Sequence, residues 1–322
     1  MKKKSLKWIH VPVNTSVVYN LKVLKDRSLM LKKVRSFFDS KNILEVDCKA
    51  LQPSPSIDAY IDLIEAPVNK TNIHYLHSSP EYAMKKLLSY GFEDIYQLGH
   101  VFRDGEKGKK HAFEFTMIEW YRKNISFDSF IEECIALIHL FIPNLPYEII
   151  TYKNLFLKHL KINPHQISLK QLQKICEEKN LLFPTDLTKD DYLNLLLTHL
   201  IEPSLPQNTI TIICNYPSTQ SALAKLKKVD NDLIAERFEI YIGSMELGNG
   251  YHELTDSREQ KKRFDEQNNI REKLHKKIYE IDNSFLKALD NIFDSYFGIA
   301  IGFDRLMMLR HQIDDISKIS FN

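Results

Sequence analysis

The chain has 322 residues, of which 43% are hydrophobic, so it can bury a substantial core and form one large domain or slightly more. Its 44 basic and 42 acidic residues leave a formal net charge of +2, which argues against a protein that coats nucleic acid through a strongly basic surface. No apolar run approaches the roughly 20 residues of a membrane span, and the segment after the first lysines is too short and interrupted for a signal peptide.

The N-terminal half predicts two helices and a hairpin. Apolar residues recur at helical spacing over 24–38, and a short strand is expected at 43–46. Residues 79–81, Ser-Pro-Glu, are typical of a helix start, with a hydroxyl N-cap, a proline in the first turn and a carboxylate near the positive end of the helix dipole. Strands over 96–103 and 114–121 are joined by a polar, charged loop, which predicts an antiparallel hairpin with a long tip.

The C-terminal half predicts helices followed by strands. A helix over 127–142 leads into residues 145–235, where prolines divide a mainly helical insertion into pieces. A strand over 238–242 precedes Gly-Asn-Gly at 248–250, which we interpret as a turn. A short apolar strand at 299–301 then enters a helix. Together these elements predict an α+β fold with an antiparallel sheet flanked by helices.

The predicted hairpin has a basic tip. The cations are Arg103 at the end of the first strand and Lys107, Lys109, Lys110 and His111 in the loop. Cations in this position suit the phosphates of a ligand. The alternative is an ordinary solvated loop.

The second strand of the hairpin predicts a face of mixed chemistry. Because side chains two residues apart share a face, Phe115, Met117, Glu119 and Tyr121 point the same way. An aromatic ring, a carboxylate and a phenol on one face indicate a ligand pocket. The alternative places Glu119 at a wet edge of the sheet.

Three carboxylates near the C terminus are the most informative feature. Glu239, Glu246 and Glu253 follow one another at intervals of seven residues, on and around strands that are otherwise apolar or glycine. Acids in such surroundings pair with cations or bind a hard metal ion such as Mg²⁺. Asn249, between two glycines, indicates a place where a ligand approaches the backbone closely. The alternative is that all three glutamates lie at an exposed edge.

Two glycines bracket the last strand and are followed at once by Asp304 and Arg305. Gly298 and Gly302 carry no Cβ, so they let the backbone pass close to a ligand. The alternative is a buried strand that enters a core helix.

These stretches resemble the class II aminoacyl-tRNA synthetases, and within them the lysyl branch, from about residue 20 onward. The residues that are similar to the three family motifs are LKKVRSFFDSKNILEV (31–46), VFRDGEKGKKHAFEFTMIEWYR (101–122) and GIAIGFDRLMML (298–309). SSPEYAMKKLL (78–88) and RFEIYIGSMELGNGYHELTDSREQ (237–260) look closer still to one subgroup, a lysyl-tRNA synthetase paralogue that joins beta-lysine to elongation factor P. The resemblance implies an N-terminal arm over 1–20, a catalytic domain over 21–322 and no anticodon-binding OB-fold.

The resemblance also implies ATP and Mg²⁺ as cofactors and assigns roles to individual residues. The implied ATP-binding residues are Arg103, Glu106, Lys110, His111, Phe115, Glu246 and Arg305, with Arg103 and Arg305 as catalytic residues. The implied metal ligands are Glu239 and Glu246. The implied substrate-binding residues are Ser79, Glu81, Glu119, Tyr121, Asn249, Glu253 and Ala300. A diamino acid would be held at both ends, with Glu81 on one amino group and Glu253 with Tyr121 on the other.

The chain departs from the family pattern at several positions. Gly105 stands where a glutamate usually reads the adenine amine, and Glu106 follows it. Ala300 replaces a glycine of the lysyl-tRNA synthetases, as in the ligase subgroup. The other departures are Lys49, Lys110 and the pair Ala112-Phe113.

The leading hypothesis is an ATP-dependent ligase that adenylates (R)-beta-lysine and transfers it to the ε-amino group of a lysine on elongation factor P. A homodimer, no membrane association and no stable tRNA binding are expected with it. Four cysteines without metal-ligand spacing indicate a reducing cytoplasm. One alternative is a truncated lysyl-tRNA synthetase-like enzyme that aminoacylates tRNA. Another is a non-catalytic paralogue that senses an amino acid.

Overall fold

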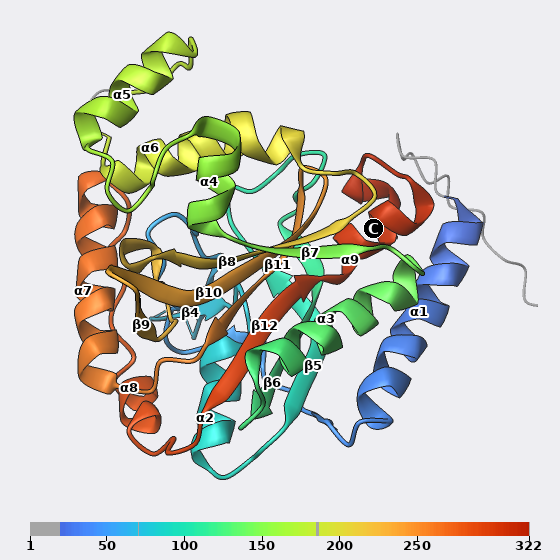
Figure 1. Ribbon diagram of the computed structural model, residues 1–322. Coiled ribbons are helices and arrows are strands. Elements are labelled where there is room, and N and C mark those ends of the chain that lie inside the picture. Colours follow the sequence, from blue (N-terminus) through green and yellow to red (C-terminus); the bar gives the residue numbers. More distant parts are fainter. Residues whose placement is uncertain (1–19, 70, 185–186, 322) are drawn as a thin grey trace, which may run out of the picture.

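The computed structural model describes residues 20–69, 71–184 and 187–321, so residues 1–19 of the expected arm lie outside the described part. Within that part, nine strands form one sheet in the order β1-β5-β6-β12-β11-β10-β8-β7, with β9 paired to β10 (Figure 1). The strands are β1 (Leu44–Glu45), β5 (Ile95–Phe102), β6 (Glu114–Lys123), β7 (Tyr147–Thr151), β8 (Ile210–Pro217), β9 (Leu226–Val229), β10 (Asp232–Ile242), β11 (Met245–His252) and β12 (Tyr296–Gly302). Neighbours are antiparallel except in the pairs β1/β5 and β7/β8, which confirms the predicted α+β class.

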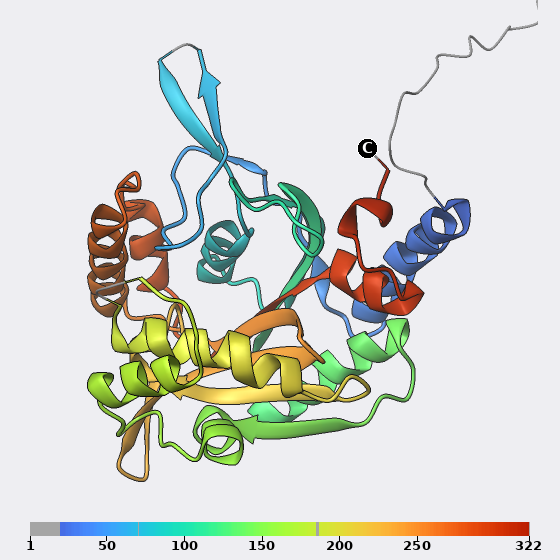
Figure 2. The same cartoon turned by 90° about the horizontal axis from the view of Figure 1, so that it is seen from above.

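A small second sheet stands apart from the large one. It contains β2 (Leu51–Gln52), β3 (Glu65–Val68) and β4 (Asn72–Leu76), in the order β2-β4-β3. The β3/β4 hairpin projects from the body of the molecule in Figure 2.

Helices cover both faces of the large sheet. One face packs against α1 (Leu21–Asp39), α3 (Phe127–Phe141) and α9 (Phe303–His311) around the buried Trp120 and Phe238. The other face meets two separate groups. The first group is α2 (Glu81–Ser89), α7 (Ser257–Lys273) and α8 (Asn283–Leu289). The second is α4 (Tyr152–Leu160), α5 (Leu169–Glu178) and α6 (Lys189–Leu196).

Side-chain caps begin several of these helices. Ser126 accepts a hydrogen bond from the Ser129 backbone at the start of α3, and Asp282 does the same for the first turn of α8. At the start of α2, Pro80 is the N-cap residue in place of the predicted Ser79, but Ser79 Oγ still accepts the Glu81 N–H at 3.0 Å. None of the described helices is long and apolar enough to cross a membrane.

The predicted turn at 248–250 is wrong. All three residues lie within β11, and the chain reverses instead after β10, where Gly243 has a φ of +54°. The glycines serve close packing between strands: a Cβ on Gly248 would lie 2.5 Å from the Ala300 carbonyl oxygen, and one on Gly250 would overlap the Phe238 ring. Close strand contact and a turn both call for glycine, so the sequence pattern alone did not separate them.

The expected helical insertion over 145–235 is narrower than predicted. Helical segments occupy parts of 152–204, including a π turn at Leu197–Ile201 and a 3₁₀ turn at Glu202–Ser204, and a further 3₁₀ turn lies at Ser218–Gln220. The strands β7, β8 and β9 of the large sheet account for much of the rest. β8 lies between β10 and β7 and is buried along most of its length, so it lacks the alternation that would have marked it as a strand.

Candidate active site

One row of side chains crosses the sheet on the face opposite α1 and α3. Strand register places Gln97, Glu119, Ala300, Asn249 and Glu239 side by side, on β5, β6, β12, β11 and β10 respectively. Directly opposed residues on neighbouring strands share a face and lie in contact range. The fold therefore brings together four residues that the sequence analysis had singled out on three separate segments.

A pocket of about 320 Å³ opens beside this row, where β6, β11 and β12 meet the start of α9. Asn249 and Ala300 of the row line it. It is also lined by every residue expected to bind ATP, namely Arg103, Glu106, Lys110, His111, Phe115, Glu246 and Arg305. Three of these seven side chains, Arg103, Lys110 and Arg305, carry a positive charge, so the pocket suits a polyanion.

Arg103 and its neighbours form one wall of the pocket. The guanidinium of Arg103 lies over the Phe115 ring, 5.2 Å from its centroid, and 3.7 Å from Glu106 Oε2. Arg103 Nε is buried and has no hydrogen-bond partner among the described residues. A buried donor without an acceptor is costly, so this arginine is prepared to receive an anionic ligand.

Arg305 reaches the opposite wall from the first turn of α9. Its Nη1 donates to the Glu246 carbonyl oxygen at 2.7 Å, and its Nη2 lies 3.0 Å from His111 Nε2. Burial, followed by the charge of Arg305, holds the pKa of His111 below its ordinary value. The imidazole is therefore neutral at pH 7 and accepts the hydrogen bond from Arg305. Lys110 Nζ donates to the Ser244 carbonyl oxygen at 3.2 Å, close to the same mouth.

Glu119 is a buried carboxylate whose direct partners are two hydroxyl groups. Ser79 Oγ donates to Oε2 at 2.6 Å, and the Tyr121 hydroxyl donates to Oε1 at 2.7 Å. Burial, followed by the charge of Glu81, raises the pKa of Glu119 to about 8. A buried acid without a paired cation attracts either a proton or a cationic ligand.

Glu81 and Glu253 are joined by Lys85, a residue that the sequence analysis did not assign to the site. Lys85 Nζ lies 2.6 Å from Glu81 Oε1 and 2.6 Å from Glu253 Oε2. Burial alone would lower the pKa of Lys85, but the two carboxylates outweigh it and raise that pKa, so the lysine is charged. Burial, opposed by Lys85, raises the pKa of Glu253 to about 7. The expected substrate residues thus form an acidic cluster with one internal cation.

Gly298 makes room for this cluster on β12. A Cβ at this position would overlap Glu253 Oε1 and would lie 2.5 Å from the Tyr121 ring. The backbone at Gly298 is thus approached closely by this chain's own acidic and phenolic side chains, and its predicted approach to a ligand stays a prediction. Gly302 has more space, since its nearest neighbour would lie at 3.6 Å.

The carboxylates of the two expected metal ligands, Glu239 and Glu246, differ in exposure and in the number of hydrogen bonds that they already accept. Glu246 lines the pocket, and its side chain is 41% exposed. Glu239 is buried and accepts hydrogen bonds from Arg237 and from the hydroxyls of Tyr216 and Tyr241.

Of the two outcomes expected for a carboxylate in apolar surroundings, Glu239 shows pairing with a cation, because Arg237 lies two residues away on the same strand face. The two glutamates also lie on different strands, β10 and β11. Among the described residues, no group of three or more histidines, cysteines, aspartates and glutamates is arranged to hold a metal ion. Glu246 fits a role as one of the few carboxylates that Mg²⁺ uses, and Glu239 fits less well because its oxygens are occupied.

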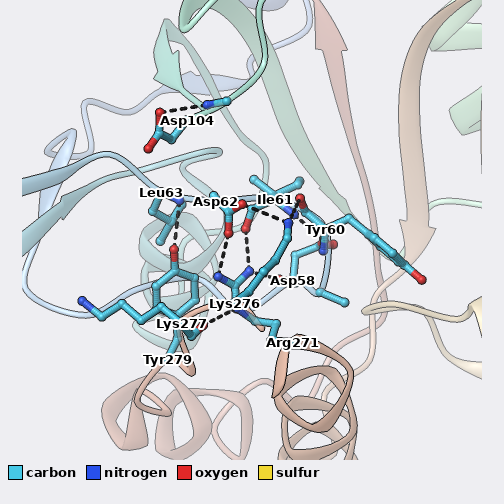
Figure 3. A network of polar contacts seen from close by, with 12 residues as sticks. Asp58, Tyr60, Ile61, Asp62, Leu63, Asp104, Arg271, Lys276, Lys277 and Tyr279 are labelled. Carbon is cyan, nitrogen blue, oxygen red and sulfur yellow. Dashed lines mark hydrogen bonds and ion pairs between the residues drawn. The ribbon is translucent and has the colours of Figure 1, made fainter. Parts of the chain in front are cut away.

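A second network supports the wall that carries Arg103. Arg271 of α7 is fully buried and donates to the Asp58 carbonyl oxygen at 2.8 Å and to Asp62 Oδ1 at 2.7 Å (Figure 3). The Asp104 N–H in turn donates to the Asp62 carbonyl oxygen at 2.8 Å. A helix near the C terminus is thereby connected to the residue that follows Arg103.

The sequence contained a signal for two of the residues that were not assigned. Lys85 follows Glu81 by four residues, which is the spacing of an ion pair on one helix face. Arg237 and Glu239 alternate on one strand face. Arg271 gave no such signal, since its carboxylate partner, Asp62, is more than two hundred residues away.

Comparison with known proteins gives a consistent result. The family described as class II tRNA synthetases (D, K and N) matches residues 4–321. The elongation factor P–(R)-beta-lysine ligase of Histophilus somni is 36% identical over 302 residues, which cover 92% of this chain and 93% of that relative. Ligases with the same name from Hamiltonella defensa and Klebsiella pneumoniae are 35% and 34% identical, again covering 92% of this chain and 93% of each relative.

Proposed function

This chain belongs to the class II tRNA synthetase family, and we propose that within it the chain is an ATP-dependent ligase that adenylates (R)-beta-lysine and transfers it to a lysine of elongation factor P. Membership of this family implies the use of ATP. The names of the relatives supply the acceptor and the amino acid for this proposal.

One observation carries the proposal: an acidic cluster for an amine-bearing substrate lies beside a basic pocket for a polyanion. Glu119 of the cluster and Asn249 of the pocket both pair with Ala300, on either side of β12. The carboxylate of an amino acid bound at the acidic cluster would therefore lie close to a phosphate bound in the basic pocket, next to β12. Such proximity is the main requirement of adenylation, because the substrate supplies its own nucleophile.

In the first step, a carboxylate oxygen of the amino acid attacks the α-phosphorus of ATP. A new P–O bond forms, and the bond to the departing pyrophosphate breaks. We assign Arg103 to the α-phosphate, where negative charge increases, and Arg305, Lys110 and His111 to the outer phosphates. Phe115 offers an aromatic face to the adenine, and Glu106 is the remaining candidate to read its amine.

Magnesium is proposed as the second cofactor. The partly exposed carboxylate of Glu246 supports this assignment, and Glu239 would contribute only by exchanging one of its present donors. The ion, when bound, would neutralise phosphate charge and assist the leaving group.

In the second step, the ε-amino nitrogen of the acceptor lysine attacks the acyl carbon of the adenylate. An amide bond forms, AMP leaves with the electrons of the broken mixed-anhydride bond between the acyl carbon and the phosphate oxygen, and the nitrogen loses a proton. The two steps together consume ATP and yield AMP and pyrophosphate.

The proposal extends to assembly and location. Leu21 and Leu29 on α1, part of which resembles the dimer-forming motif, are 64% and 55% exposed. These exposed leucines, just before the residues that resemble that motif, support the proposal of a homodimer. All four cysteines are free thiols, which supports a cytoplasmic protein.

Radiolabelled pyrophosphate exchange into ATP tests the first step. We expect exchange with (R)-beta-lysine, weaker exchange with α-lysine and none with norleucine, which has the same chain length but lacks the second amine. Failure of all three amino acids would favour the non-catalytic sensor. Transfer of labelled beta-lysine to purified elongation factor P tests the second step, and transfer to tRNA instead would favour the synthetase alternative.

A further inference from the structure

The amino-acid pocket contains a permanent cation that takes no direct part in the proposed reaction. Lys85 is 1% exposed, and both of its ion-pair partners, Glu81 and Glu253, are expected to bind substrate. Burying a charged lysine costs free energy, so we expect Lys85 to have a role in the charge balance of this cluster.

The charges of the cluster do not balance. Glu81, Glu119 and Glu253 carry three negative charges when ionised, and Lys85 supplies one positive charge. The cluster therefore has two negative charges in excess, which matches the two ammonium groups of a diamino acid. A substrate with one ammonium group would leave one buried carboxylate without a partner.

Protons can replace the substrate in the empty cluster. Burial first, and the neighbouring carboxylates next, raise the pKa of Glu119 to about 8, and burial raises the pKa of Glu253 to about 7. Both carboxyl groups thus hold part of a proton near neutral pH. Binding of a dication would favour their ionised forms and expel these protons.

The surroundings add few other charges. On Glu253 the next cation is Lys225, which favours the ionised form, and the phenol of Tyr251 lies in the field of Glu81 and Glu253. On Glu119 the neighbours are Tyr121 and the Cys48 thiol, and burial raises the pKa of both groups. These phenols and this thiol are uncharged near pH 7, and Lys225 contacts His252 outside the cluster, so the three acids and Lys85 determine the charge of the cluster.

We propose that Lys85 sets the charge of the pocket at two negative charges, so that the pocket selects a doubly charged amino acid and releases protons when that substrate binds. The inference rests on the proposed function and goes further, since it assigns a specificity-determining residue. Lys85 acts through Glu81 and Glu253 and does not itself need to touch the substrate.

The pH dependence of the KM for the diamino acid tests this inference. In the wild type, the KM in pyrophosphate exchange should fall by up to about 100-fold per pH unit below about pH 7, where both Glu119 and Glu253 hold a proton, and by up to about tenfold between about pH 7 and about pH 8. It should level off above about 8, where Glu119 is ionised. In Lys85→Met, Glu81 and Glu253 lose their cation, and their pKa values rise. The pH above which the KM no longer changes should therefore be higher by about one pH unit or more. A purely structural role would change the KM without moving this profile.

Lys86→Met is the matched control. Lys86 is the next residue of α2, but it pairs with Asp282 at 2.7 Å, outside the cluster. Its variant should keep the wild-type profile. Because Lys85→Met removes a buried ion, calorimetry of the wild type provides a second measurement that needs no variant. Titration of beta-lysine at about pH 7 in two buffers of different ionisation enthalpy should show release of between about one and about two protons per substrate bound.

The outcomes separate the two proposals. If the wild type catalyses exchange and the pH profile of the KM is the same in Lys85→Met, the inference about Lys85 is wrong and the ligase proposal stands. If calorimetry shows that beta-lysine binds without release of protons, the inference is also wrong and the ligase proposal stands. If no diamino acid supports exchange by the wild type, the proposed function falls and this inference falls with it.

Discussion

Removing the charge of Glu246 should impair the reaction of ATP while leaving the protein folded. Its side chain is partly exposed, and its nearest cation is Arg305, with Nη1 at 3.7 Å from Oε2. Glu246→Gln keeps the size of the side chain and removes its charge, so we expect a folded protein whose magnesium-dependent adenylate formation falls roughly 100-fold.

Glu114→Gln is the control for this change. Glu114 begins β6, is 57% exposed and pairs with His100 outside the pocket. Exchange rates measured over a range of magnesium concentrations should be normal in this variant. Full activity of Glu246→Gln would remove this residue from the magnesium assignment.

Ala300 lies between Glu119 and Asn249, at the centre of the row that crosses the sheet. Its methyl group would occupy space beside the amine-bearing carbon of the substrate and favour an amine moved by one carbon. A change of this size is worth about 10–200-fold in selectivity, so Ala300→Gly should shift adenylation toward α-lysine. The substitution should cost roughly 1 kcal/mol in stability. Pyrophosphate exchange with both isomers measures the ratio, and an unchanged ratio would assign Ala300 to packing alone.

At the scale of elements, β11 and β12 form a boundary between the core and the pocket. Gly250 lies against the core residue Phe238, and Gly298 lies against Glu253 and Tyr121. The same substitution on the two strands should therefore have different effects. We expect Gly250→Ala to lower the free energy of unfolding by about 1–3 kcal/mol, with little change in the KM of the remaining folded protein.

Gly298→Ala should act on substrate binding first. The added methyl group would displace the carboxylate of Glu253, so the KM for the amino acid should rise by about tenfold or more, while the KM for ATP changes less. Chemical denaturation and steady-state kinetics of both variants provide the comparison. Equal losses of stability with no difference between the two KM values would contradict this division of the sheet.

Elements with strong local patterns were predictable from the sequence, and those set by long-range contacts were not. The hairpin of β5 and β6 is where its alternating strands and charged tip placed it. β8 was missed because burial between two strands removes alternation, and the turn was misplaced because glycine also permits close packing. Within the site, the row through Glu119, Ala300 and Asn249 depends on strand register, which the sequence analysis did not derive.

At the scale of the whole molecule, the site depends on contacts between distant segments. Asp304 accepts the Thr116 N–H at 2.7 Å and also pairs with Arg27 of α1, so the start of α9 is connected to β6 and to the first helix. Arg271 connects α7 to the segment beside Arg103 (Figure 3). Binding at the pocket should therefore affect the stability of the entire domain.

The acidic cluster leads to a prediction about stability and pH. The pKa of Glu119 is about 8 in the folded protein, and its ordinary value is 4.5. At intermediate pH the folded state binds a proton that the unfolded state has lost, so this group contributes stability that declines as the pH rises through about 8. The empty protein should accordingly show a Tm that falls by a few degrees between about pH 7 and about pH 8.5.

Glu119→Gln isolates this contribution, because its side chain does not titrate. Thermal unfolding of both proteins at the two pH values should show a smaller decline in the variant. Groups outside the acidic cluster titrate alike in both proteins, so the difference between the two slopes belongs to Glu119 and to its interaction with Glu81 and Glu253. A saturating diamino acid should also reduce the decline in the wild type, since the dication stabilises the ionised carboxylate. Identical slopes in the two proteins would show that Glu119 is already ionised in the empty pocket at neutral pH.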